Sequence, residues 1–336
     1  MFRANAQGGS TLEEHTDLLL LYEVARLYYE DGLTQEEIAG HLGFSRSRIQ
    51  RLLEAARREG IVEIHLVSPA ISFSDLEEEL AARFRLRKVI VVPAPTHSLY
   101  LIRRSIGRAA AHYLESLLRD GDVLGIGWGR TIYEALNFLR RRVAITIVPL
   151  IGAVGQVEVD FQVNELGSQL AKRIGGFFVP FYAPALVDSE GIAQALFSDQ
   201  SVRRVVELWD EVTVALVGMG DPRKEGSIVP KFFLSDPSSA AVLKRDDVVG
   251  DVLYHFLKGD GSLADATFDR RVMSIPLEKL KDIPHVVGVA GSLEKVEVLE
   301  AVLRGGYINA LVTDQETARV LLERSEKGGE VQKKRA

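Results

Sequence analysis

Residues 121–131 read GDVLGIGWGRT, and this stretch indicates how the large part of the chain folds. Its apolar start is typical of a buried strand, and the glycines that follow predict a tight turn into a helix. At such strand ends the exposed N–H groups of the next helix attract anions. The candidate anion-binding residues of this turn are Gly127, Trp128, Gly129, Arg130 and Thr131.

Strand-like and helix-like segments alternate on both sides of this stretch. Long helical patterns occur between the strands, including those at 100–118 and 162–174. The alternation predicts a Rossmann-like α/β domain, with a mostly parallel sheet covered by helices on both faces. The segments rich in β-forming apolar residues are 88–93, 122–129, 144–152, 211–220, 285–291 and 308–313.

Three further strand ends are also rich in glycine. They are the loop at 152–155, the turn at 218–220, and Gly291-Ser292 followed by Lys295. A single end of this kind usually reflects turn chemistry alone. In open α/β sheets, however, ligands bind beyond the carboxyl ends of the strands, so four such ends together favour an anion pocket.

The chain lacks the motifs of common nucleotide sites and of catalysis. The first turn has the spacing G-x-G-x-G, which is neither the dinucleotide fingerprint G-x-G-x-x-G nor a Walker loop. The seven His residues are scattered, and no metal-ligand cluster, H-E-x-x-H or G-x-S-x-G motif is present. The absence of Cys excludes disulfides and suits a reducing compartment. We therefore predict no catalytic residue, metal or cofactor.

The first sixty residues predict three short helices. A helix over 16–30 is followed by Thr34 and Glu37, which form a capping-box pattern for a second helix. Gly43 supplies a tight turn, and Ser45 is placed to cap a third helix. This succession has the spacing of a helix-turn-helix, the motif that inserts its last helix into the major groove of DNA.

The third helix is locally basic in an acidic chain. The whole chain has a net charge of −6, whereas residues 45–58 contain five Arg and one Glu. Arg48 and Gln50 are the candidates for direct readout, because Arg can bridge the acceptors of guanine and Gln can pair with adenine. The residues predicted to lie near base edges are Arg46, Ser47, Arg48 and Gln50. Those predicted to hold phosphates are Arg46, Arg51 and Arg57. The alternative is an ordinary three-helix bundle with a solvated Arg face.

The length of 336 residues favours two domains of unequal size. Residues 61–66, IVEIHL, alternate apolar with polar residues and predict a short strand after the third helix. The predicted parts are a winged helix-turn-helix domain at 1–67, a linker at 68–75, an α/β domain at 76–325 and a polar tail at 326–336.

Together these motifs resemble the SorC family of sugar-responsive bacterial transcriptional regulators over nearly the full length of the chain. The resemblance implies a sensor domain similar to sugar-phosphate isomerase and deaminase domains that have been converted to ligand sensing. The segments that carry it are 19–64 at the front and then GDVLGIGWGRT, VPLIGAVG, NELGSQLAKRIGG, VGDVLYHF and GVAGSLEKVEVLEAVLRGGYINALVTD.

The resemblance also implies a set of effector-binding residues. Asp251 is expected to accept sugar hydroxyls, and Lys295 to pair with a phosphate or a hydroxyl. The residues that follow VGD depart from the family pattern, so only the class of the effector is inferred, a phosphorylated sugar or a related polyol. The other expected contacts are Gly127, Trp128, Gly129, Arg130 and Thr131 in the first turn and Gly152, Ala153 and Gly155 in the second loop.

The expected function is regulation of a carbohydrate-metabolism operon through binding of double-stranded operator DNA. A helix-turn-helix monomer reads only a half-site, so a homo-oligomer, dimer or tetramer, is expected. No signal peptide or membrane-spanning pattern is present, which favours the cytoplasm. The alternative is an isomerase-like or deaminase-like enzyme with an appended helical domain. Asp251 or Glu165 are the carboxylates such an enzyme would use, but no accompanying His is evident.

Overall fold

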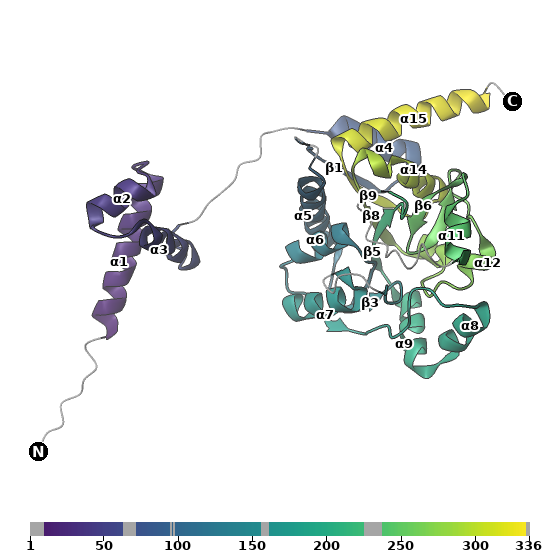
Figure 1. The fold of residues 1–336 in the computed structure, drawn as a ribbon, viewed down its shortest axis with the longest axis horizontal. Helices are drawn as coiled ribbons and strands as arrows, with labels where there is room; N and C mark the ends of the chain where they lie inside the picture. The colour runs from purple at the N-terminus through teal and green to yellow at the C-terminus, as the bar shows by residue number, and fades with distance from the viewer. Residues whose placement is uncertain are drawn as a thin grey trace, which may run out of the picture. The chain divides into compact units, whose positions relative to one another are not determined.

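The computed structural model describes residues 10–62, 72–94, 96, 98–155, 161–224 and 237–333. The chain divides into two compact units, Met1–Ala70 and Ile71–Ala336, and each is described by itself. One unit is helical and the other combines strands with helices (Figure 1). The predicted fold class, a helix-turn-helix region followed by a mostly parallel α/β domain, is confirmed.

The small unit contains the three predicted helices. The Glu37 N–H donates to the Thr34 hydroxyl and the Thr34 N–H donates to the Glu37 carboxylate, so the capping box forms. Gly43 has a φ of 66°, in the left-handed region that favours glycine. The helices share one apolar core, in which Ile38 and Ile49 are fully buried. They are α1 (Ser10–Tyr29), α2 (Gln35–Leu42) and α3 (Arg46–Arg58).

The predicted domain boundaries differ from the observed helix ends. Residues 63–71, which hold most of the predicted wing strand, lie outside the described residues. Helix α4 (Ser74–Phe84) begins inside the segment 68–75 that was expected to be a linker. Helix α15 (Gln315–Lys333) continues beyond residue 325, so most of the predicted polar tail extends a helix.

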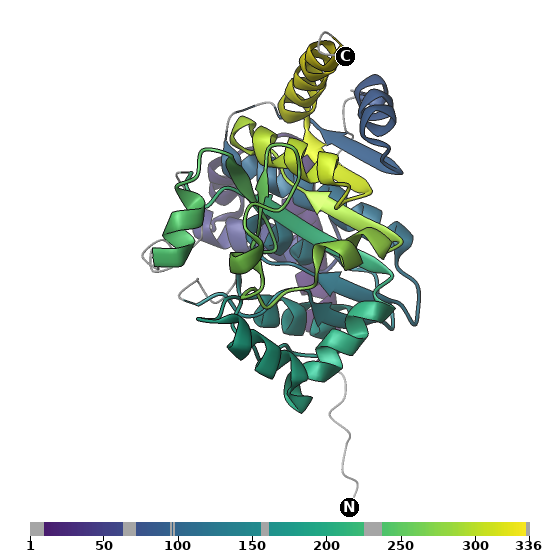
Figure 2. The same ribbon diagram turned by 90° about the vertical axis from the view of Figure 1, so that its right-hand side faces the viewer.

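One sheet of nine strands organises the described part of the large unit (Figure 2). Parallel strands follow the order β1-β9-β8-β5-β2-β3-β4, and β6 and β7 form an antiparallel hairpin attached to β5. The strands are β1 (Lys88–Val92), β2 (Val123–Ile126), β3 (Thr146–Pro149), β4 (Phe177–Phe178), β5 (Val214–Gly220), β6 (Val248–Val252), β7 (His255–Lys258), β8 (His285–Val289) and β9 (Ala310–Asp314).

All six predicted strands are present, with shorter bounds, whereas β4, β6 and β7 were not predicted. Strand β4 has only two residues and pairs only at the sheet edge. The hairpin lacks the usual sequence signal because Leu253 and Tyr254 occupy its turn with φ values of 52° and 68°. Turns of this kind normally use Gly, Asn or Asp.

Helices cover both faces of the sheet. Successive strand residues point to opposite faces, so Val123 belongs to one apolar core and Leu124 to the other. The core around Leu124 includes α5 (Leu99–Leu117), α6 (Arg130–Phe138) and α7 (Val163–Ile174). The other helices among the described residues are α8 (Glu190–Ser198), α9 (Gln200–Leu208), α11 (Pro237–Leu243), α12 (Ala266–Asp269), α13 (Leu277–Asp282) and α14 (Val296–Gly305), with short 3₁₀ turns at Trp209–Glu211 and Leu293–Lys295. No helix in the described ranges is long and apolar enough to span a membrane.

The close packing of α5 against α6 depends on Gly107. A Cβ atom at this position would lie 2.6 Å from Glu134 Cβ and 2.8 Å from the Ala135 nitrogen. We expect Gly107→Ala to lower the free energy of unfolding by about 1 to 3 kcal/mol, because overpacking forces backbone shifts. The control is Gly191→Ala, whose Cβ would meet nothing closer than Ser189 Oγ at 4.0 Å. Equal denaturation midpoints for the two variants would contradict this account of the interface.

Candidate effector cavity and DNA-binding helix

Helix α3 presents its basic residues on the exposed side of the small unit. Its N-cap is formed by Ser45, whose hydroxyl accepts the Arg48 N–H at 3.3 Å. Ile49, Leu53 and Ala56 are buried in the core and fix which side of the helix faces outward. All the predicted DNA contacts are exposed, namely Arg46, Ser47, Arg48, Gln50, Arg51 and Arg57.

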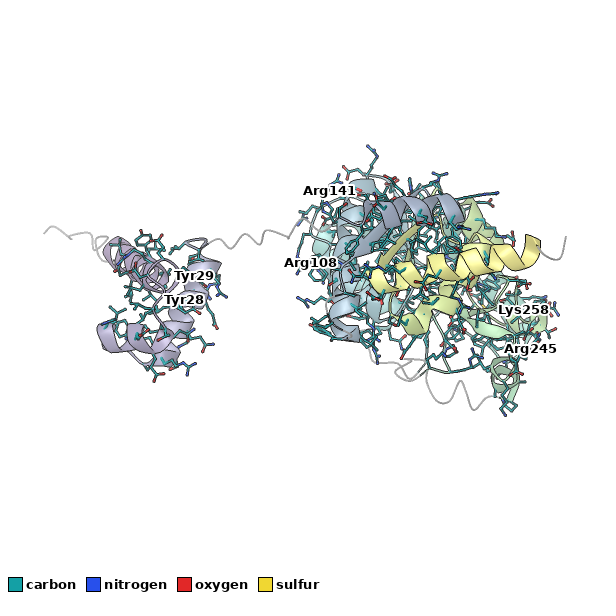
Figure 3. The ribbon with its side chains drawn as sticks, turned by 90° about the horizontal axis from the view of Figure 1, so that it is seen from above. Tyr28, Tyr29, Arg108, Arg141, Arg245 and Lys258 are labelled. Carbon is teal, nitrogen blue, oxygen red and sulfur yellow. The ribbon has the colours of Figure 1, made fainter. Side chains whose placement is uncertain are left out.

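Contacts within the small unit orient several of these side chains. The Arg48 guanidinium stacks over the Phe44 ring, 3.8 Å from its centroid. Arg57 lies near the other end of the helix, and its Nε donates to the hydroxyl of Tyr29 on α1 at 2.9 Å (Tyr29 is labelled in Figure 3). Arg57 is therefore held by α1, whereas Arg48 is held by the turn before α3.

A cavity lies at the carboxyl edge of the parallel strands in the large unit. Three strand ends line it: the turn from Trp128 to Ile132 after β2, the stretch from Gly218 to Pro222 at the end of β5, and the loop from Val289 to Lys295 after β8. Asp251 and Leu253 come from the hairpin, and Arg103 comes from α5. This is the edge at which the sequence predicts an anion pocket.

Six predicted effector residues meet in this cavity, namely Trp128, Gly129, Arg130, Thr131, Asp251 and Lys295. Gly127 lies beneath them. Its N–H donates to the Leu216 carbonyl at 2.8 Å, and a Cβ there would lie 3.1 Å from Leu253 Cδ2. Gly127 therefore permits close packing below the cavity and is not among its lining residues.

The loop at 152–155 does not line this cavity, contrary to the expectation for Gly152, Ala153 and Gly155. Gly152 donates its N–H to the Met273 carbonyl at 2.8 Å, and a Cβ on it would lie 2.5 Å from two backbone oxygens. Ala153 pairs with the backbone at Ala183. Backbone pairing with two other segments thus accounts for this small-residue loop.

Basic side chains from three elements converge on the cavity. They are Arg103 from α5, Arg130 from α6 and Lys295 from the loop after β8. Burial and the proximity of Arg130 lower the pKa of Arg103, and burial lowers the pKa of Lys295. Lys295 Nζ donates to the Met219 carbonyl at 3.1 Å. Sequence reasoning missed Arg103, although it lies one turn into the helix that follows β1, where the strand-end rule also applies.

The acidic side of the cavity contains Asp251, which is 7% exposed. Burial raises the pKa of Asp251 to about 6, while the Tyr254 N–H, which donates to it at 3.0 Å, and the charge of Lys295 oppose that rise. Asp221, also buried, is neutralised by Arg223 through two hydrogen bonds of 2.8 Å. Asp251 and Asp221 are thus the two buried carboxylates among the cavity's lining residues, and Asp221 is ion-paired with Arg223.

The hairpin turn that carries Asp251 is strained. Leu253 and Tyr254 both have positive φ, a conformation that is uncommon for residues other than glycine. The hydrogen bond from Tyr254 to Asp251 holds the turn, and the Tyr254 ring packs edge-on against Trp128 at 5.6 Å. This contact joins the hairpin turn to the first Gly-rich turn.

A buried histidine, His255, follows the hairpin turn at the start of β7. His255 Nδ1 is 2.6 Å from Asp269 Oδ1, and its Nε2 is 2.7 Å from Ser274 Oγ and 2.9 Å from the Ile275 carbonyl oxygen. The residue types are those of a hydrolytic triad, but Ser274 and His255 are each 3% exposed and neither lines the cavity. The cluster therefore anchors β7 to the segment at 269–275.

The raised pKa of Asp251 predicts a specific pH dependence of stability. Between its ordinary value of 3.8 and about 6, the folded protein binds more protons than the unfolded chain. The contribution of this group thus falls as pH rises through that window, by about 3 kcal/mol at most. Asp251→Asn removes the effect, so the wild type should lose stability relative to this variant between pH 4 and 6. The control is Asp260→Asn, because the pKa of Asp260 is lowered. Parallel wild-type and Asp251→Asn profiles would contradict the assignment.

Comparison with known proteins identifies both units. Residues 68–323 match the family described as a putative sugar-binding domain. Residues 23–59 match the model of sigma-70 region 4. The first match covers most of the large unit, and the second covers the end of α1 together with α2 and α3.

The similar proteins are transcriptional regulators, and the similarity extends over nearly their full length. The sorbitol operon regulator of Klebsiella pneumoniae is 32% identical over 93% of this chain and 100% of that protein. The deoxyribonucleoside regulator of Bacillus subtilis is 28% identical over 90% and 97%. The crystal structure of the full-length Klebsiella regulator SorC superposes with a TM-score of 0.69 over 91% of this chain and 99% of that chain. These relatives do not favour the enzyme alternative, and the chain belongs to the SorC family of sugar-responsive bacterial transcriptional regulators.

Proposed function

We propose that this regulator responds to a phosphorylated sugar or polyol bound in the cavity at the carboxyl edge of the sheet. The observation that carries the proposal is the convergence of three Gly-rich strand ends on one cavity that also holds Arg103, Arg130 and Lys295. Backbone N–H groups at strand ends and helix starts, combined with cations, suit a phosphate.

The cavity also suits the uncharged part of such an effector. Asp251 and Glu294 supply carboxylate oxygens that accept hydrogen bonds from sugar hydroxyls. The Thr131 hydroxyl and the start of α6 lie in the same cavity as Lys295. We assign the phosphate to Arg130, Thr131 and Lys295, and the hydroxyls to Asp251.

The small unit is proposed to read operator DNA through α3. Arg48 and Gln50 are assigned to base edges, and Arg46 and Arg51 to phosphates. Arg57 is also assigned to a phosphate. Its guanidinium is already held in place by the hydrogen bond to Tyr29, which favours such a contact.

Assembly and coupling complete the proposal. Two half-sites require at least a dimer, and we propose a dimer or tetramer that acts in the cytoplasm. An effector that favours one arrangement of the small units by about 1 to 3 kcal/mol changes operator affinity by about 5 to 150 fold. Analytical ultracentrifugation tests this assembly, and a monomer that binds operator tightly would refute it.

The effector class is tested by thermal melting against a panel of phosphorylated and free sugars and polyols. A ligand at 100 times its Kd stabilises the folded state by about 2.7 kcal/mol, so the matching compound should raise the melting temperature. Thr131→Ala and Lys295→Ala should abolish the shift, whereas Lys244→Ala, at an exposed position outside the cavity, should retain it. A shift that survives Lys295→Ala would place the ligand elsewhere.

The DNA contacts are tested by selection from a random-sequence duplex library, followed by titration at several salt concentrations. Arg48→Ala should cost about 1 to 3 kcal/mol on the selected site and relax the preference at one base pair. Arg51→Ala should weaken all sequences alike and reduce the salt slope by about 1. Arg58→Ala, on the same helix beside Glu59, is the charge-matched comparison. Uniform weakening by Arg48→Ala would contradict its role in base readout.

A further inference from the structure

The loop after β8 forms one wall of the cavity and has an unusual backbone. Gly291, Ser292, Glu294 and Lys295 all line the cavity. Ser292 has a φ of 85°, in the region that L side chains rarely adopt. A loop in this conformation needs a partner that holds it, because the strained state must be stabilised by its surroundings.

That partner is Asp314, the last residue of the neighbouring strand β9. The Ser292 N–H donates to Asp314 Oδ2 at 2.7 Å, and Asp314 is 1% exposed. The same oxygen would lie 2.3 Å from a Cβ at position 291, so only glycine fits beside it. The carboxylate thus supports the wall of the cavity from behind without being one of its lining residues.

The same carboxylate begins helix α15. Asp314 Oδ1 accepts the N–H groups of Glu316 and Thr317 at 3.0 Å each, and Oδ2 also accepts the Thr317 hydroxyl at 2.7 Å. One buried side chain therefore satisfies two of the unpaired amides of a helix start and one amide of the cavity loop.

Helix α15 begins at this point and contacts α4, the first described helix of the large unit. It packs against α4, and Leu80 of α4 and Leu321 of α15 belong to the same apolar core. Figures 2 and 3 both show the two helices side by side. Helix α4 begins at Ser74, where the chain enters the large unit from the segment that follows the DNA-binding unit.

We propose that Asp314 is a positioning residue of the effector site and couples occupancy of the cavity to helix α15. This inference rests on the proposed effector function. A ligand that contacts the loop from Gly291 to Lys295 alters the hydrogen bond that the Ser292 N–H donates to Asp314. Because the same carboxylate accepts hydrogen bonds from the first turn of α15, the stability of that turn changes as well.

The test is hydrogen–deuterium exchange of the full chain, with and without inorganic phosphate. The variant is Asp314→Asn. Asn caps helices about as well as Asp, so its side-chain oxygen can still accept the hydrogen bonds from the first amides of α15. Its NH₂ group then faces the Ser292 N–H, and because both groups are donors, that hydrogen bond is lost. The control is Asp265→Asn, which changes another N-cap, that of α12, outside the cavity.

Without ligand, Asp314→Asn should speed exchange in a peptide spanning 290–296 about tenfold, because a hydrogen bond to a buried charge is lost. Exchange at 315–322 should change little, and Asp265→Asn should leave both peptides unchanged. Unchanged exchange at 290–296 in Asp314→Asn, or equal acceleration by the control, would overturn the positioning role.

Hydrogen–deuterium exchange in the presence of phosphate distinguishes this inference from the proposed function. In the wild type, phosphate should slow exchange at 128–132, at 290–296 and at 315–322, whereas in Asp314→Asn the slowing at 315–322 should be lost. Slowing at 315–322 that persists in the variant, or that is missing from the wild type while 128–132 is protected, would overturn the coupling. Absence of protection at 128–132 would count against the anion site itself, and the ligand-free comparison would still decide the positioning role.

Discussion

Burial of both faces of a parallel sheet is the constraint on which the large unit depends. Its strands are apolar along their length because helices exclude water from both sides, as at Val214–Gly220. Polar groups gather instead at the strand ends, where helices begin with amides that have no intrahelical partner. The cavity lies at that edge because backbone donors, cations and carboxylates meet there without interrupting either core.

The parallel layers alone do not complete the cavity. The β6–β7 hairpin brings Asp251 and Leu253 to it, through a turn of two left-handed residues. Such a turn persists only where its surroundings hold it. Here the Tyr254 N–H is held by Asp251, and the strand that follows is anchored through His255. The strained turn and the contacts that hold it therefore lie within a few residues of Asp251 and Leu253, which line the cavity.

The small unit is organised differently, because its structure follows from local signals. Caps at Thr34 and Ser45 set the starts of α2 and α3, and the apolar stripe of α3 turns its basic side outward. The orientation of individual side chains is a separate matter. Phe44 supports Arg48 from the preceding turn, whereas Tyr29 holds Arg57 from another helix.

The helix-turn-helix, the six main strands and the Gly-rich strand ends could be predicted from local patterns, because caps, glycine turns and apolar periodicity act over a few residues. Tertiary structure decided what depends on distant pairing. It separated the 152–155 loop from the cavity by pairing it with Ala183 and Met273, and it added Arg103 from α5. It also joined Ser292 to Asp314 across two strands. Such contacts form between residues far apart in the chain, and no local pattern encodes which strand ends will meet.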